Sequence, residues 1–96
     1  MYARTVTIKL NPEMWNEALE FGDSVKEQIA GFPGLKSWVL MANQGTGECT
    51  SFAVFESEHA FKAVNDQINQ ILSQFGRFFV SPPNEILGDV LVHVEN

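Results

Sequence analysis

The five apolar residues from Trp38 to Ala42 constrain the fold of this chain more than any other stretch. They follow a Gly-Phe-Pro-Gly corner, which favours a turn, so the block begins a new element. Successive side chains of a strand point to opposite faces, and a strand without polar residues is therefore apolar on both faces. The stretch from Phe52 to Phe55 has the same character. Two expected strands thus need cover on both sides.

The rest of the chain alternates between the periods of strands and helices. Val6, Ile8 and Leu10 recur at every second position, which is typical of a strand with one apolar face. Asn11 then offers an N-cap, and apolar residues recur at helical steps up to Gly31. Ser57 begins a second helix in the same way, which Gly76 or the following double proline ends. We expect strands at residues 2–10, 35–43, 49–56 and 86–94, with a hairpin turn at 44–47.

This order predicts an α+β fold, the ferredoxin-like βαββαβ plait, as a single domain over residues 1–96. In that fold a four-stranded antiparallel sheet carries both helices on one face. The apolar block leaves the second face without cover. A second copy packed sheet against sheet is the simplest cover, so we expect a homodimer through the sheet faces, a dimeric α+β barrel.

Composition excludes several classes of partner. The net charge of −6 repels phosphate backbones and anionic lipid, so we expect neither nucleic acid nor membrane as a partner. The single cysteine, Cys49, permits no internal disulfide, and no thiol pair is present to hold a metal. No apolar run has the length of a signal or transmembrane segment. We therefore expect a cytoplasmic protein without a metal or cofactor.

Several short motifs carry a family resemblance. The run SFAVFESEHAFKAV, the Gly-Phe-Pro-Gly corner before it and PPNEI after it together resemble the antibiotic-biosynthesis-monooxygenase domain of the dimeric α+β barrel superfamily, especially its small stand-alone members. The resemblance implies a pocket between sheet and helices. Members of that family oxidise polycyclic aromatic phenols to quinones with molecular oxygen and without metal or flavin, while relatives degrade haem or have no known activity.

The residues that the resemblance makes functional differ in this chain. By position, the Trp, Asn and Tyr of the quinone-forming members fall on Phe55, Ser51 and Phe61. A phenylalanine cannot transfer a proton. The Arg that the resemblance implies along the second helix has no obvious counterpart, and Gln70 is the nearest polar candidate. Haem-degrading relatives place a histidine on the second helix, where this chain has only His59 in the first turn. Whether the chain is an enzyme stays open.

Six residues are candidates for a pocket. Arg4 shares strand parity with Val6 and is either a buried clamp for an anionic or phenolic oxygen or a solvent-reaching group at a frayed strand end. His93 is either a base near neutral pH or a surface or interface residue. Trp38 either lines a pocket for a flat aromatic ligand or fills the core or the dimer interface. Cys49 has no flanking base, which favours a buried hydrophobe over a nucleophile. The candidate pocket residues are Arg4, Trp38, Ser51, Phe55, Phe61 and His93.

Three functions are compatible with these residues. The first is a cofactor-independent, monooxygenase-like protein that binds or oxidises a small aromatic molecule of the phenol or quinone type, using a dry cavity and one cation. The second is a dimeric binding module with the same cavity and no catalysis. The third is an interaction or stress-response dimer in which phenylalanine side chains fill that space. Turnover with oxygen, ligand-induced stabilisation without turnover, or neither would distinguish them.

Overall fold

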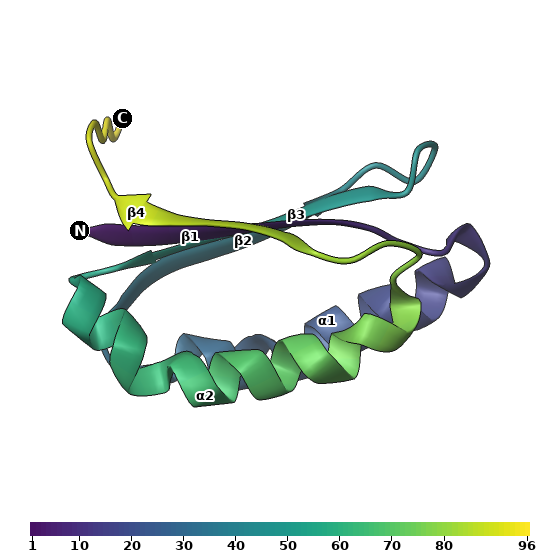
Figure 1. Ribbon diagram of the computed structural model, residues 1–96, viewed down its shortest axis with the longest axis horizontal. Helices are drawn as coiled ribbons and strands as arrows, with labels where there is room; N and C mark the ends of the chain where they lie inside the picture. Colours follow the sequence, from purple (N-terminus) through teal and green to yellow (C-terminus); the bar gives the residue numbers. More distant parts are fainter.

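The chain forms a four-stranded sheet covered on one face by two long helices (Figure 1). The computed structural model describes residues 1–96. All pairs of neighbouring strands are antiparallel, in the order β2-β3-β1-β4, which confirms the ferredoxin-like α+β fold. The elements are β1 (Tyr2–Lys9), the 3-10 helix η1 (Pro12–Met14), α1 (Trp15–Ala30), β2 (Leu35–Ala42), β3 (Glu48–Phe55), α2 (Glu58–Phe75), the 3-10 helix η2 (Gly76–Phe78) and β4 (Asn84–Asp89).

Side-chain caps begin the helical segments near the expected positions. The Asn11 carboxamide oxygen accepts a hydrogen bond from the Glu13 N–H at 3.1 Å, although the first turn is 3-10 and the α-helix starts only at Trp15. The Ser57 hydroxyl accepts from the Ala60 N–H at 3.1 Å and caps α2. Neither helix is long and apolar enough to cross a membrane.

Two glycines provide backbone conformations that other residues rarely adopt. Gly34 has a φ of +81° at the corner before β2, and Gly47 has a φ of +80° in the β2–β3 hairpin. A Cβ atom on Gly34 would lie 2.6 Å from the Cβ of Ala60. The corner therefore needs glycine both for its conformation and for its close approach to α2.

The hydrophobic core lies between the sheet and the helices. Phe78 is at the centre of one cluster of buried residues and Phe55 of a second, and edge-on contacts join the aromatic rings within each. Val54 belongs to neither cluster, although it is buried. Its strand partners, Ala3 and Ser37, alternate with residues that face the helices, so Val54 lies on the opposite face.

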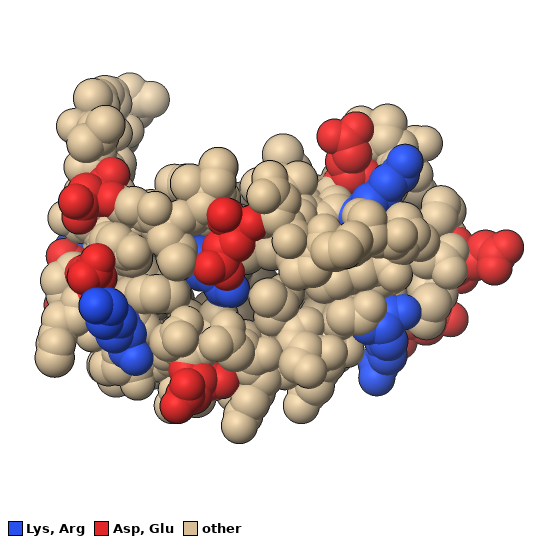
Figure 2. Space-filling model, viewed as in Figure 1, with Lys and Arg blue, Asp and Glu red and all other residues tan.

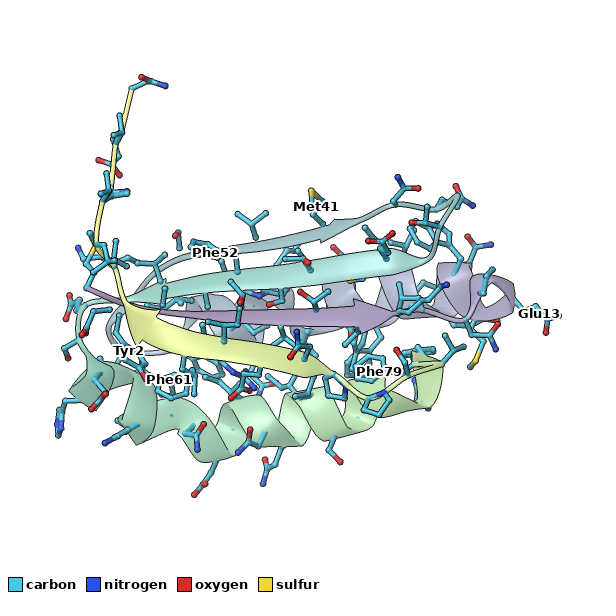
Figure 3. The ribbon with its side chains drawn as sticks, turned by 45° about the horizontal axis from the view of Figure 1, so that its top comes forward. Tyr2, Glu13, Met41, Phe52, Phe61 and Phe79 are labelled. Atoms are coloured by element: carbon cyan, nitrogen blue, oxygen red, sulfur yellow. The ribbon has the colours of Figure 1, made fainter.

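That opposite face of the sheet has no helix over it and carries apolar side chains. Met41 and Phe52 project from it, away from the helices, whereas Phe61 extends from α2 under the sheet (Figure 3). The large hydrophobic residues exposed there are Val39, Met41, Phe52 and Ile86. The two-sided apolar pattern of β2 and β3 thus leaves apolar side chains exposed on the face without helices, as the sequence predicted.

The last strand differs from the expected one. We expected residues 86–94, but β4 spans Asn84–Asp89. β4 pairs only with β1, and Tyr2 at the start of β1 is opposite Asp89. The Val90 N–H still donates to the Met1 carbonyl at 2.9 Å, after which β1 offers no further partner. Residues beyond Val90 leave the sheet on the side away from the helices (Figure 1).

Candidate functional site

A small cavity lies between the sheet and the helices. Its volume is about 100 Å³, and most of its lining is apolar. A cavity that takes a whole drug-sized ligand is at least about 300 Å³. The lining comes from β1, α1, the corner between α1 and β2, β2, β3 and α2, and its polar or ionisable members are Arg4, Trp38, Ser51 and Cys49.

Arg4 is buried in this lining and paired. Its side chain is only 7% exposed, which decides between the two interpretations of its position on β1: it does not reach freely into solvent. The Nε atom donates to Glu85 Oε2 at 2.9 Å, and Nη2 donates to the same oxygen. Figure 2 shows basic and acidic side chains together at a hollow between the sheet and α2. The guanidinium is therefore a neutralised cation beside the cavity.

Trp38 and Ser51 form a second polar contact in the lining. The indole Nε1–H of Trp38 donates to the Ser51 hydroxyl oxygen at 2.9 Å. Leu40 is directly opposite Ser51, and Trp38 lies two residues before Leu40 on the same face of β2. Trp38 and Ser51 therefore both face the helices from neighbouring strands. The contact uses one lone pair of the hydroxyl and leaves its O–H free to donate.

Of the three remaining candidate residues, Phe55 lines the cavity, whereas Phe61 and His93 do not. Phe61 packs in the core against Tyr2 and Phe55, with ring centroids 5.5 Å apart in both pairs. His93 lies outside the cavity, since β4 ends before it; its side chain is nearly half exposed and is 3.8 Å from Glu95. The expected placement of His93 in the pocket is wrong for that reason.

The other reactive side chains contribute no nucleophile or base. Cys49 is buried in the lining, and desolvation raises the pKa of its thiol above the ordinary value, so the thiol is protonated at neutral pH. His59 is exposed in the first turn of α2, and Gln70 is also exposed. The cavity therefore contains hydrogen-bond donors, one cation and apolar surface.

Glu85 is the residue of this site that the sequence analysis missed. It is two residues before Leu87, which is directly opposite Arg4, so both side chains lie on the helix-facing side. Starting the last strand at Asn84 would have included Glu85 with the parity of Leu87, but its pairing with Arg4 depends on the register between β1 and β4. The motif PPNEI contains the residue, but the expected strand began one position after it.

These features define a ferredoxin-like α+β protein with a small apolar cavity between its sheet and helices. Its fold is that of the antibiotic biosynthesis monooxygenases: one such structure superposes with a TM-score of 0.80 at 13% identity, covering 96% of this chain and 100% of the other. The resemblance seen in the motifs is confirmed at the level of the fold. With the sequence itself, no family model matches and no curated protein matches.

Two further solved structures are similar over nearly the whole chain. A monooxygenase from the gene ActVA-Orf6 of Streptomyces coelicolor, in complex with the ligand Nanaomycin D, has a TM-score of 0.77 at 18% identity and covers 99% of this chain and 91% of its own. A dimeric ferredoxin-like protein from an uncultured marine organism has a TM-score of 0.78 at 10% identity, with coverage of 99% and 91%. At such identities the likeness concerns the fold and leaves the substrate undefined.

Proposed function

We propose that this protein binds a small aromatic molecule in the cavity between its sheet and helices. The observation that carries the proposal is an apolar cavity with a buried, hydrogen-bonded guanidinium in its lining. Apolar surface favours the ring of such a ligand, and a few fixed polar groups orient it. Arg4 and Ser51 supply those groups here.

The volume limits the size of the ligand. The cavity measures about 100 Å³, whereas a dry cavity of about 150 Å³ in another protein accommodates benzene. A single ring therefore requires rotations of the lining side chains that enlarge the cavity by about half, and a fused three-ring molecule requires far more space. We propose a single-ring phenol or a compound of similar size.

Thermal unfolding with phenol as the probe tests this proposal. Saturable binding should raise the melting temperature of the native protein in proportion to the logarithm of the free phenol concentration. Ala53 lines the cavity, and Ala53→Leu would occupy part of its space. We expect Ala53→Leu to abolish the increase. No increase in the native protein, or an equal increase in both proteins, would refute binding at this cavity.

Oxidation of the bound molecule is the second candidate function, and the structural likeness to the Streptomyces coelicolor monooxygenase favours it. For phenol the balanced reaction converts phenol and O₂ into benzoquinone and water. The phenol gives up four electrons, one oxygen atom becomes the new carbonyl, and the other leaves in water. Oxygen uptake with phenol, and its absence in the Ala53→Leu protein, would support this candidate. Binding without oxygen uptake would leave a non-catalytic binding module.

We also propose that the protein is a homodimer formed through the open sheet face. Three strands of eight residues and one of six present a face of at most about 19 Å by 26 Å, or about 500 Å². A stable interface buries about 800 Å² per partner. The segment after β4 leaves the sheet on this same side (Figure 1), and its exposed residues Leu91, Val92 and Val94 can supply part of the difference.

Phe52 offers the cleanest test of this interface. Its side chain is 42% exposed on the open face, whereas Leu19 is 48% exposed on α1. In light scattering, Phe52→Asp should give a monomer, because dimerisation would bury an unpaired charge. Leu19→Asp should stay dimeric. A dimer of unchanged stability in the Phe52→Asp protein would exclude the sheet-to-sheet arrangement.

We also propose a cytoplasmic location, because a chain with a single cysteine, Cys49, cannot form the internal disulfides typical of small secreted domains.

A further inference from the structure

Arg4 is the only charged residue in the lining of the cavity, and its counter-charge lies outside the lining. The remaining members of the lining are apolar residues, serine, tryptophan and a protonated cysteine. Glu85, on the edge strand β4, is 38% exposed and receives both hydrogen bonds of the ion pair through Oε2. Arg4 Nη1 makes no hydrogen bond within the protein. The pair is therefore electrically neutral, yet it keeps free N–H donors.

This neutrality affects anionic and uncharged ligands differently. A carboxylate beside Arg4 would be attracted to the guanidinium but repelled by Glu85 on its other side, so the ion pair would offset less of its lost hydration than an unpaired guanidinium would. An uncharged carbonyl or amide oxygen loses much less hydration. It can still accept a hydrogen bond from a charged donor, which is stronger than one from a neutral donor.

Ser51 is suited to the same kind of ligand atom. Ala53 is directly opposite Arg4, and Ser51 lies two residues away on the same face of β3. Such diagonal neighbours are about 7–8 Å apart at the backbone. Because the Ser51 oxygen already accepts from Trp38, its O–H remains available as a donor. An acceptor oxygen between the two side chains would satisfy both donors.

We propose that Glu85 is a specificity-determining residue that makes the cavity select uncharged ligands with an acceptor oxygen over anionic ligands of the same shape. This inference rests on the proposed binding function and adds the charge of the ligand to it. Glu85 acts through Arg4 and does not itself line the cavity.

Benzamide and benzoate are matched probes, because they have nearly the same shape and differ by one negative charge at neutral pH. By titration calorimetry, the native protein should bind benzamide at least about tenfold more tightly than benzoate. In Glu85→Gln the guanidinium loses its counter-charge, and benzoate should bind at least about tenfold more tightly than to the native protein. Benzamide affinity should change by less than about threefold.

A control variant separates the local effect from net charge. Asp66→Asn removes one negative charge from an exposed position on α2, and it should leave the ratio of the two affinities unchanged. If Glu85→Gln does not fold by circular dichroism, the native protein still decides: benzoate binding as tightly as benzamide would overturn the proposal. An unchanged ratio in a folded Glu85→Gln protein would also overturn it. If phenol raises the melting temperature of the native protein but neither benzamide nor benzoate binds it, the selectivity is refuted and the binding function stands. If phenol does not bind either, binding at this cavity is itself refuted.

Discussion

The Arg4–Glu85 pair should respond unequally to the loss of each partner. Arg4 is 7% exposed and Glu85 is 38% exposed, so the two charges differ in their access to water once the pair is broken. Removing one partner of a buried pair costs about 3–5 kcal/mol when the remaining charge stays buried. An exposed pair contributes only about 0–1 kcal/mol. Glu85→Ala should therefore approach the first range.

Arg4→Met should cost much less, about 1 kcal/mol or below. The Glu85 carboxylate can turn into water, and methionine keeps much of the apolar volume of the arginine stem. A buried ion pair replaced by an apolar side chain is often neutral for stability or even stabilising. The expected difference between the two variants is therefore about 2–4 kcal/mol, with Glu85→Ala the less stable protein.

Equilibrium unfolding in urea measures this difference. The free energies of unfolding should be compared at one protein concentration, with an unchanged dependence on urea as the sign that the transition stays two-state. Asp23→Ala is a control, because Asp23 and Lys26 form an ion pair in which both side chains are mostly exposed. It should change stability by less than about 1 kcal/mol. An Arg4→Met protein as unstable as Glu85→Ala would refute the reasoning from burial.

Two further predictions concern single residues. Gly34→Ala should destabilise the protein by at least about 1–2 kcal/mol, because Gly34 has a left-handed conformation and a Cβ atom there would clash with Ala60. Gly76 has a helical φ and open space around it, so Gly76→Ala should be neutral or stabilising in the same urea experiment. Because burial raises the pKa of Cys49 above the 9.0 of an unperturbed thiol, the unfolded chain ionises first, and stability should fall as the pH rises from about 9 through the higher folded pKa. The slope of unfolding free energy against pH in that window should be smaller for Cys49→Ala, and equal slopes would contradict the assignment.

Local patterns in the sequence predicted most of the fold for physical reasons that the structure confirms. The change from period two to helical spacing, the Ser57 cap and the glycine corner are each local signals, and each marks an element boundary to within a few residues. The inward direction of Arg4 also followed from parity alone.

The site was less predictable because it depends on contacts between distant residues. The end of β4 is fixed by where β1 begins, so the apolar alternation through His93 overstated the strand. The partner of Arg4 depends on the register between β1 and β4, which no local pattern encodes. The volume of the cavity depends on how the lining side chains pack, and composition does not determine that.

The position of β1 at the centre of the sheet has a consequence for biosynthesis. β1 leaves the ribosome first, yet its two neighbours in the sheet, β3 and β4, are made later, and Glu85 is synthesised 81 residues after Arg4. Until then the arginine has no counter-charge and one edge of β1 has unpaired backbone groups. Before β4 is made, the helices and the β2–β3 hairpin are only marginally stable, so the nascent chain should hold at most local structure. The sheet should close late, because contacts between sequence-distant residues form slowly. A stalled chain that lacks β4 would expose the unpaired backbone edge of β1 and become a substrate for chaperones.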